Sequence, residues 1–360
     1  MRLGIIGLPY VGKSTVFACL TRAKAKHGHG EEAQVAVVKV PDERLDKLGE
    51  MFAPRKKVPA TVEYVDFAPL GKEEKRGDFS PGLLAQMRLV DAFLEVVRFF
   101  GDPQVSHPQG SLDPLRDVGR VEAELILSDL IVVENRLGRI QQMAKVGRKE
   151  GTPMERDLLQ RLKETLEKGG PLRNLDFNAE EEKALANFGF LSLRPLLLVM
   201  NVGEEQLSEK ARQERQRSFA ESIQGKRIGF AEICGKVEEE IEELSPQEEA
   251  EFLKEYGLAE SGASQVIRES YRQLERISFF SIGDKEVRAW TIPQGTTALK
   301  AAGTIHTDFE RGFIKAEVIP FETLVEAGSI PHAREKGWLR LEGKEYGVKD
   351  GDVITFRFHV

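Results

Sequence analysis

The stretch GLPYVGKST at residues 7–15 has the residue types and the spacing of a loop that cradles phosphate groups, GxxxxGK(S/T). Gly7 and Gly12 let backbone N–H groups turn toward phosphate oxygens, and the first turn of a following helix adds unpaired donors. We expect Lys13 to reach the β- and γ-phosphates and Ser14 to ligate Mg²⁺. The other nucleotide contacts expected from this loop are Pro9, Tyr10, Val11 and Thr15. A glycine-rich turn without a ligand is the alternative interpretation.

Such a loop needs a strand before it and a helix after it, and the sequence has both patterns. The apolar run at 3–6 is typical of a buried parallel strand, and residues 13–20 can continue as a helix. Strand patterns then alternate with helical ones, which predicts an α/β domain with a mostly parallel sheet. The further strands are expected at 35–40, 60–67, 92–99, 195–201 and 227–233.

Asp66 stands at the end of an apolar strand run, where an aspartate that holds Mg²⁺ through water or through Ser14 is expected. Lys13 and Asp66 are therefore the residues that we expect to act in catalysis, and Ser14 and Asp66 are the expected metal ligands. The alternative is a carboxylate that only caps the turn after its strand.

Asn201 ends another hydrophobic strand, and Glu204 follows three residues later. Because ligands bind at the carboxyl ends of parallel strands, both side chains are expected to face the nucleotide. The remaining residues expected to contact the nucleotide are Val202, Cys234 and Gly235.

Composition limits the class of protein to which the chain can belong. A chain of 360 residues with 41% hydrophobic content is globular, with about two or three domains. No run approaches the roughly eighteen apolar residues of a membrane span, there is no signal peptide, and Cys19 and Cys234 lack metal-ligand spacing, so a cytoplasmic protein is expected. A formal charge of −7 argues against nonspecific nucleic-acid binding and against a DNA partner.

A long helical segment at 112–194 interrupts the strand pattern. Apolar residues alternate there at steps of four and three, as in the seam of a coiled coil: Ile126, Leu130, Val133, Leu137, Ile140 and Ala144. A second seam, Leu159, Leu162 and Leu166, follows the break at 151–153. The pattern predicts an antiparallel helical hairpin inserted in the sheet domain.

Basic residues gather near the expected tip of this hairpin, and no acidic residue lies between them: Arg136, Arg139, Lys145, Arg148 and Lys149. They could contact RNA phosphates, or they could form an ordinary solvated helix face.

From residue 277 the chain changes to short strands punctuated by glycine and proline, which predicts a separate β-rich domain at 277–360 after a first domain at 1–276. Trp290, Phe309 and Phe313 could stack on RNA bases, but in so small a domain a core role is favoured. His306 is expected in a strand-rich segment with a structural hydrogen bond.

The chain resembles the Obg-related YchF proteins, also called Obg-like ATPases, over essentially its full length. The resemblance rests on GLPYVGKST and on four longer runs: VPDERLDKL at 40–48, LVDAFLEVVRFF at 89–100, EVRAWTIPQGTTALKAAGTIHTDFERGFIKAEVI at 286–319 and EGKEYGVKDGDVITFRF at 342–358.

This resemblance implies a P-loop G domain with a coiled-coil insertion and a C-terminal TGS domain of β-grasp type. It also implies association with the ribosome, through the large subunit or the 70S particle, and a role in translation or stress control. The implied activity is Mg²⁺-dependent hydrolysis of ATP in preference to GTP.

Base preference can be argued from the residues at the end of the strand expected at 195–201. GTPases of the wider class use NKxD, whose aspartate accepts hydrogen bonds from guanine, whereas this chain has Asn201, Val202, Gly203 and Glu204. The glutamate carboxylate should overshoot the guanine position, and a lost buried pair is worth about 1–3 kcal/mol. We therefore expect ATP to bind at least as well as GTP.

The catalytic side departs from the family pattern. Pro69 replaces a family glycine whose backbone N–H would meet the γ-phosphate. Leu70 fits the family pattern, which has a hydrophobic residue in place of the glutamine that orients water in related GTPases, and it cannot orient water. Residues 26–32 lack the switch hydroxyl that completes the Mg²⁺ shell, and Tyr10 replaces the asparagine that can hold a monovalent cation.

His27 and His29 could position water instead, although their glycine neighbours favour a mobile surface loop. We expect hydrolysis below about 0.1 per minute. Two functions stay open: a slow ATPase or GTPase whose nucleotide, ATP/ADP or GTP/GDP, changes ribosome association, and a nucleotide-occupied scaffold that binds the ribosome or its RNA with little hydrolysis.

Overall fold

The computed structural model describes residues 1–22, 33–67, 80–148, 150–223, 225–283 and 285–359. The chain forms two compact units. The first consists of Met1–Ala36 with Glu63–Gln273, and the second of Val37–Val62 with Leu274–Val360. Within the described residues, no helix is both long enough and apolar enough to cross a membrane. The domain division at 276 and 277 stays a prediction.

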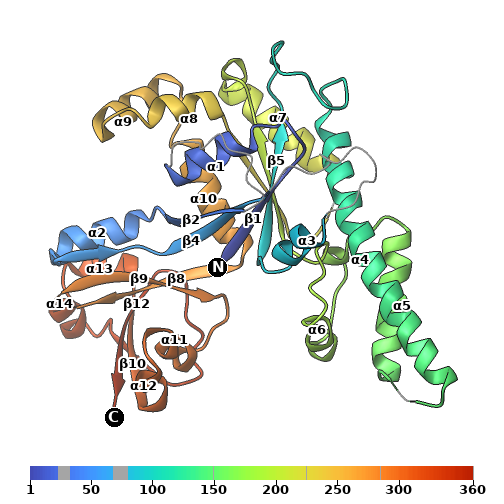
Figure 1. The fold of residues 1–360 in the computed structure, drawn as a ribbon. Coiled ribbons are helices and arrows are strands. Elements are labelled where there is room, and N and C mark those ends of the chain that lie inside the picture. Colours follow the sequence, from blue (N-terminus) through green and yellow to red (C-terminus); the bar gives the residue numbers. More distant parts are fainter. Residues whose placement is uncertain (23–32, 68–79, 149, 224, 284, 360) are drawn as a thin grey trace. The chain divides into compact units, whose positions relative to one another are not determined.

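The six-stranded sheet of the first unit has the order β2-β4-β1-β5-β6-β7 (Figure 1). Its strands are β1 (Arg2–Ile6), β2 (Gln34–Lys39), β4 (Thr61–Asp66), β5 (Ala92–Arg98), β6 (Leu196–Asn201) and β7 (Ile228–Ile233). β1 pairs in parallel with β4 and β5, β5 pairs with β6, and β6 pairs with β7 in the same sense. The six expected strands and the mostly parallel sheet are confirmed.

Helices cover this sheet because its central strands are apolar on both faces. Every residue of β5 and of β6 is buried, as expected of parallel strands with helices on both sides. The helices are α1 (Lys13–Thr21), α3 (Pro81–Met87), α7 (Glu209–Ser222), α8 (Gly235–Ile241), α9 (Pro246–Glu255) and α10 (Gly262–Gln273). α10 packs against β6 and β7, and α1 packs against α8 and α10.

The helical hairpin is confirmed between β5 and β6 (Figure 1). Its elements are α4 (Pro114–Lys145), α5 (Pro153–Glu167), the short turn η1 (Leu172–Asn174) and α6 (Ala179–Leu185). Asp113 and Thr152 cap the two long helices, and a proline follows each cap, where no helical N–H is needed. The two seams meet in one core, from Ile126 to Ile140 on α4 and from Leu158 to Leu166 on α5.

The expected seam is wrong at its last position, because Ala144 is exposed. The chain reverses earlier than the pattern implies. A Cβ atom added to Gly151, in the turn before α5, would lie 3.1 Å from Ile140 Cδ1. Ala144 therefore projects one turn beyond the point where α5 begins, and the seam ends at Ile140.

The second unit has a mixed sheet with the order β11-β10-β12-β8-β9-β3. Its strands are β3 (Lys56–Val58), β8 (Arg276–Ile282), β9 (Glu286–Pro293), β10 (Phe313–Pro320), β11 (Arg340–Glu342) and β12 (Asp352–Phe358). Its helices are α2 (Glu43–Phe52), α11 (Ala298–Ile305), α12 (Thr307–Arg311), α13 (Phe321–Ala327) and α14 (Ile330–Glu335). β12 pairs in parallel with β8 between two antiparallel pairs, and α11 contacts β9 and β10, which is the expected β-grasp arrangement.

The aromatic side chains of this unit form its core. Phe313 is buried, and Trp290 and Phe309 pack against the same cluster, so the core interpretation of these three residues is confirmed. Trp290 Nε1 donates a hydrogen bond of 2.8 Å to Ser281 Oγ. His306 does not lie in a strand as expected: it caps α12, where its Nδ1 accepts the Asp308 N–H at 3.2 Å.

Candidate nucleotide-binding site

The loop between β1 and α1 needs its two glycines for steric reasons. Gly12 has a φ of 85°, and a Cβ atom there would lie 2.2 Å from Asn201 Nδ2. Gly7 has a φ of 152°, and a Cβ atom there would lie 2.9 Å from the Val96 carbonyl oxygen. The loop therefore packs so closely on β5 and β6 that only glycine fits at either position.

Tyr10, in the middle of the same loop, has a left-handed backbone with a φ of 63°, and its side chain is 65% exposed. A tyrosine is strained in this conformation, which asparagine tolerates better. The loop thus holds backbone strain at the residue where the chain departs from the family pattern. Strain of this kind persists where the surrounding structure fixes the backbone, as at binding sites.

Lys13 and Asp66, the two expected catalytic residues, lie together. Lys13 begins α1 and Asp66 ends β4, and the Lys13 Nζ to Asp66 Oδ1 distance is 2.5 Å. The same ammonium group donates to the Phe67 carbonyl. Both side chains are nearly buried, at 5% and 12% exposure, so their interaction is weakly screened. The sheet brings a cation and a carboxylate to the edge that carries the phosphate loop.

The donor set beside the loop fits a magnesium nucleotide. Ser14 is exposed on the first turn of α1, and Asp66 offers carboxylate oxygens on the neighbouring strand. A hydroxyl and a carboxylate, completed by phosphate oxygens and water, are ligands that Mg²⁺ accepts. The described residues contain no group of three or more His, Cys, Asp or Glu side chains that could hold a metal ion.

Asn201 joins two of the expected nucleotide segments. Its side chain is 4% exposed, its Nδ2 donates to the Val11 carbonyl at 3.0 Å, and its Oδ1 accepts from the Gly235 N–H at 3.3 Å. Gly235 in turn lies against Thr15, because a Cβ atom on Gly235 would meet Thr15 Cγ2 at 2.8 Å. The structure thus gathers Val11, Thr15, Asn201 and Gly235. Direct contact of Asn201 with a base stays a prediction.

The other expected base contacts lie on the same edge of the sheet. Val202 is buried, and Glu204 begins the short turn η2 (Glu204–Gln206). Lys236 Nζ lies 3.2 Å from Glu204 Oε1, and this partner raises the pKa of Lys236. Cys234 is buried before α8, and desolvation raises the pKa of its thiol, so it is a neutral side chain at neutral pH.

Two residues that the sequence analysis did not single out lie beside the loop. Arg98, the last residue of β5, donates to the Tyr10 carbonyl at 3.4 Å. The Phe100 ring lies under its guanidinium, with Cζ 4.4 Å from the ring centroid. Phe100 Cε1 is also 3.8 Å from the Cβ position of Gly12. The sequence contains one signal for them, a charged residue within the apolar run LEVVRFF.

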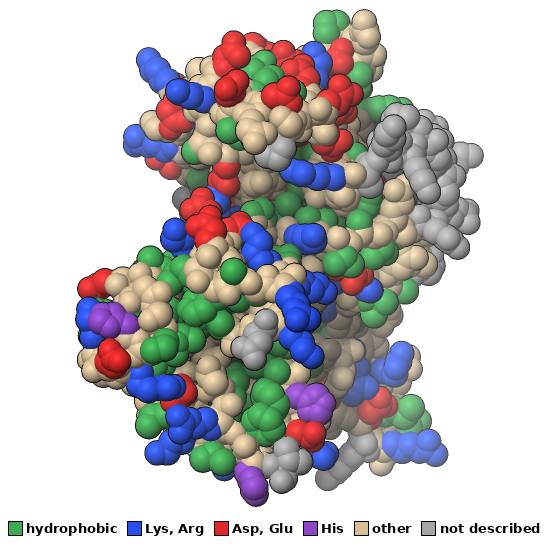
Figure 2. All heavy atoms as spheres, turned by 90° about the vertical axis from the view of Figure 1, so that its left-hand side faces the viewer, with side chains coloured by type: hydrophobic (Ala, Val, Ile, Leu, Met, Phe, Trp, Pro, Cys, Tyr) green, Lys and Arg blue, Asp and Glu red, His purple; other side chains and the backbone are tan. Residues whose placement is uncertain are grey.

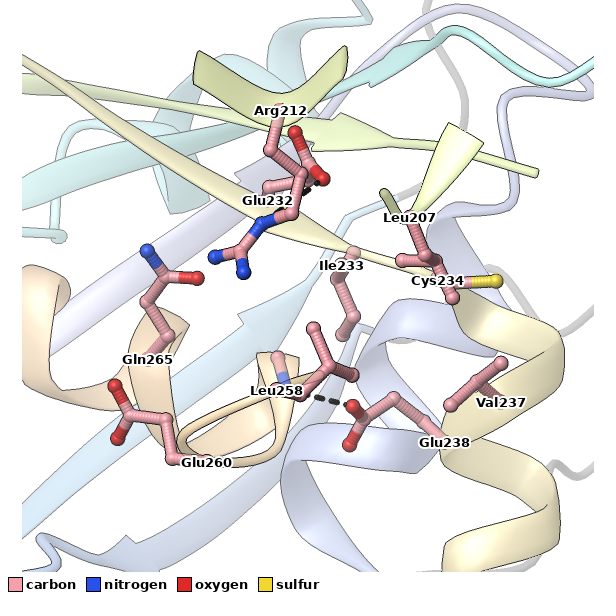
Figure 3. Close-up of a pocket in the computed structure, with 11 residues that line it drawn as sticks. Leu207, Arg212, Glu232, Ile233, Cys234, Val237, Glu238, Leu258, Glu260 and Gln265 are labelled. Atoms are coloured by element: carbon pink, nitrogen blue, oxygen red, sulfur yellow. Dashed lines mark hydrogen bonds and ion pairs between the residues drawn. The ribbon is translucent and has the colours of Figure 1, made fainter. Parts of the chain in front are cut away.

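A small pocket lies behind the Cys234 segment (Figure 3). Figure 3 shows Glu238 pointing to the chain near Gly262, whose N–H donates to Glu238 Oε1 at 2.7 Å. Desolvation, aided by repulsion from Glu249 and Glu242, raises the pKa of Glu238 to about 7. On the other side, buried Glu232 pairs with Arg215 at 2.7 Å and with Arg212 at 3.6 Å. These contacts hold α8 and β7 in place next to Cys234 and Gly235, two of the residues expected to contact the nucleotide.

Other expected residues lie outside this constellation. His27, His29, Pro69, Leu70 and Lys149 are outside the described residues. At the hairpin tip, Arg136 pairs with Glu150 at 2.5 Å and with Glu155 at 2.8 Å, so its charge is neutralised within the hairpin. The exposed basic residues described at the tip are Arg139, Lys145 and Arg148.

Negative charge is concentrated far from this tip in the sequence. Figure 2 shows acidic side chains gathered over α8 and α9, where Glu239, Glu240, Glu248 and Glu251 are exposed. An RNA backbone would be repelled from those helices.

Comparisons with known proteins give one consistent result. A family model named YchF-GTPase_C, described as a protein of unknown function (DUF933), matches residues 276–359. The chain is 41% identical to the "Ribosome-binding ATPase YchF" of Bacillus subtilis (strain 168), with 99% of each chain covered. It is 40% identical to the protein of the same name in Escherichia coli O157:H7, over 100% of this chain and 99% of the relative. It is also similar to the solved structure of the Schizosaccharomyces pombe YchF GTPase, with a TM-score of 0.83, 28% identity and coverage of 99% and 97% of the two chains.

Proposed function

The chain belongs to the YchF family, and we propose that it is a ribosome-associated nucleotidase that binds a purine nucleotide with Mg²⁺ at residues 7–15. One observation carries the proposal: Lys13 and Asp66, which are 53 residues apart, meet beside a loop whose glycines cannot be replaced. The names of the relatives, which specify ribosome binding and ATP hydrolysis, support the same function.

Different residues of the site are proposed to bind the phosphates and the metal. The N–H groups at the start of α1 and the Lys13 ammonium would bind phosphate oxygens, and Ser14 and Asp66 would hold the metal. The chemistry that Mg²⁺ would supply there is neutralisation of the phosphate charge. For both roles to be filled, the Lys13–Asp66 ion pair must open, with the lysine turning to phosphate and the carboxylate to the metal. Each charge then exchanges one buried partner for another.

The residues proposed to contact the base do not form a guanine-specific site. The Glu204 carboxylate already has a cationic partner in Lys236, and Val202 is buried, at 2% exposure. A guanine contact through Glu204 would have to compete with that ion pair, which is exposed and contributes little stability. We propose that ATP binds at least as well as GTP, and a clear excess of GTP affinity would contradict this.

Hydrolysis by the isolated protein is proposed to be slow, below about 0.1 per minute. Pro69 has no N–H for the γ-phosphate, Leu70 cannot orient water, and residues 26–32 offer no hydroxyl to the metal. The same residues favour a second candidate function, a scaffold that keeps its nucleotide bound and contacts the ribosome without hydrolysis. Arg139, Lys145 and Arg148 are its proposed contacts with ribosomal RNA phosphates.

The proposed domain arrangement is a G domain at 1–276, interrupted by the helical insertion at 112–194, and a TGS domain at 277–360. The family model that matches 276–359 supports the last boundary. The second compact unit also includes Val37–Val62, which in this arrangement is an excursion of the G domain.

Calorimetric titration of nucleotide-stripped protein with ADP, GDP and non-hydrolysable ATP and GTP analogues tests the proposal. Lys13→Ala should weaken binding at least about 100-fold, because it removes a cation from the phosphates. Lys210→Ala, on the exposed face of α7, is the matched control and should bind as the wild type does. Equal binding by the Lys13→Ala variant would exclude the loop as the site. Single-turnover hydrolysis with and without ribosomes then separates the nucleotidase from the scaffold.

A further inference from the structure

Arg98 is a buried charge that satisfies its donors on backbone carbonyls. It ends the central strand β5 and is 3% exposed. Within the described part of the chain, no carboxylate forms an ion pair with it. A buried guanidinium without a counter-ion is expensive to desolvate, and hydrogen bonds must offset that cost.

The hydrogen bonds of Arg98 reach two different segments. On one side, Nη1 donates to the Tyr10 carbonyl of the phosphate loop at 3.4 Å. On the other side, Nε donates to the Phe100 carbonyl at 3.2 Å, and Nη2 donates to the Asp102 and Val105 carbonyls at 3.5 and 3.0 Å. The second segment runs on to Asp113, the cap of α4. One guanidinium therefore bridges the phosphate loop and the chain that enters the helical hairpin.

The two sides of this bridge differ in the number of hydrogen bonds. Three carbonyls on the hairpin side accept from Arg98, at 3.0 to 3.5 Å, whereas the phosphate loop contributes one, the Tyr10 carbonyl at 3.4 Å. The hairpin side therefore holds the guanidinium by more contacts than the loop side does. A polyanion on the loop would lower the energy of this positive charge, which has no ion-pair partner among the described residues, because Coulomb interactions are strong in a buried environment. A nucleotide bound to the loop would therefore stabilise one position of the Arg98 side chain more than others. Such a difference in interaction energy between two states is what coupling between sites requires.

We propose that Arg98 is a positioning residue that couples nucleotide occupancy of the phosphate loop to residues 99–113 and so to the base of the helical hairpin. The inference rests on the proposed nucleotide binding at residues 7–15. Coupling is reciprocal. The hydrogen bonds that hold Arg98 to the phosphate loop and to the hairpin base should therefore also increase the affinity for nucleotide.

A purely structural role for Arg98 makes a different prediction. If the side chain only filled the end of β5, nucleotide would leave the exchange of residues 99–113 with solvent unchanged, and replacing Arg98 would loosen the loop and the hairpin base equally with or without nucleotide. The discriminating quantity is therefore the nucleotide-dependent change in this segment, not its absolute stability.

Hydrogen exchange measured by mass spectrometry on the full-length protein, with ADP and Mg²⁺ or without nucleotide, provides that quantity. In the wild type, ADP should slow the exchange of amides in 99–113 at least about fivefold, the lower end of typical coupling. Arg98→Lys keeps the charge but cannot reach four carbonyls, so it should remove this slowing and weaken ADP binding about fivefold or more. Arg217→Lys, an exposed arginine on α7, is the matched control and should behave as the wild type does.

A second variant covers the case in which Arg98→Lys fails to fold. Asp102 Oδ1 accepts the Gln104 N–H at 2.8 Å and so holds the turn that presents the Asp102 and Val105 carbonyls. Asp102→Ala loosens this turn from a partly exposed position and should reduce the ADP-dependent slowing without touching the phosphate loop.

Calorimetry on the same samples separates the two possible failures. If the wild type binds no nucleotide, the proposed function is wrong. If it binds ADP but exchange in 99–113 does not change, or if folded Arg98→Lys or Asp102→Ala retains the full slowing, the coupling role of Arg98 is overturned.

Discussion

The carboxyl ends of the central strands in the first unit and the core of the second unit bury their side chains in opposite ways. At the strand ends, Arg98 and Asn201 are buried and use their polar atoms on the backbone of neighbouring loops. In the second unit, Phe279 and Phe356 meet edge to face with ring centroids 6.0 Å apart, in a cluster of apolar residues. Buried polar groups orient loops at a cost in stability, whereas an apolar core stabilises without orienting a ligand. Substitutions in the two regions should therefore separate binding from stability.

The largest effect is expected in the apolar core. Phe279→Ala should lower the free energy of unfolding of the second unit by about 3–5 kcal/mol, because the ring is fully buried. Both tryptophans of the chain, Trp290 and Trp338, belong to this unit, so urea unfolding followed by tryptophan fluorescence reports on it directly. Nucleotide affinity should not change. Phe279→Leu, as the control, should lose much less stability. A parallel loss of nucleotide affinity in either variant would contradict the separation of stability from binding between the two regions.

A polar substitution at the strand ends should act on both quantities. Asn201→Ala leaves the Val11 carbonyl and the Gly235 N–H buried without their partner, which costs about 1–3 kcal/mol. Nucleotide affinity should fall about tenfold, because the two loops lose their link. Titration with a fluorescent ADP analogue measures this. Asn178→Ala removes the exposed cap of α6 and should leave affinity intact. An unchanged affinity in Asn201→Ala would mean that the loops do not need the amide.

The pH dependence of stability gives a third test. The folded-state pKa of Glu238 is raised from 4.5 to about 7, mainly by desolvation, so the native state holds a proton that the unfolded state releases. The contribution of protonated Glu238 to the free energy of unfolding is fully present below pH 4.5 and is lost as the pH rises through about 7. Above pH 7, Glu238→Gln should therefore be more stable than the wild type by about 1–3 kcal/mol.

Far-UV circular dichroism during urea unfolding, between pH 4.5 and 8.5, measures this difference. Glu239→Gln, at an exposed neighbouring position, is the control and should follow the wild-type curve. A stability difference for Glu238→Gln that is the same at every pH would contradict the assignment of the proton to Glu238.

The smallest effect concerns strain in the phosphate loop. Tyr10→Asn should stabilise the left-handed backbone at φ 63° by about 1 kcal/mol and tighten nucleotide binding a few-fold. Tyr10→Phe keeps the strain and should match the wild type. If Tyr10→Asn instead binds nucleotide more weakly, the exposed tyrosine ring contributes to binding and outweighs the strain.

Local patterns were enough to predict much of the first unit. Each of the six strands appears as an apolar run, and the glycines of the phosphate loop are constrained by what surrounds them, as the motif implies. The hairpin seam followed the heptad rule until Ile140, where the turn geometry ended it. Periodicity within one element specifies its buried face, and that information is local.

Pairings between distant segments could not be predicted in this way. β3 pairs in parallel with β9, with Lys56 opposite Glu286, and this brings Val37–Val62 into the second unit. No local pattern encodes a pairing between strands so far apart in the chain. The Arg98 bridge is similar, because a single arginine in an apolar run does not specify which carbonyls it will meet. Its hydrogen-bond partners follow from the folded positions of the surrounding loops.

The length of α4 gives its base a mechanical significance. With 32 residues at about 1.5 Å each, the helix is a rod of about 48 Å that is stiffened along its seam by α5. A rotation of about 5° at the Asp113 cap would sweep the far end through about 4 Å, roughly the width of one side chain. The hairpin would thus act as a lever, turning a rotation of a few degrees at its base into a displacement of about 4 Å at its tip.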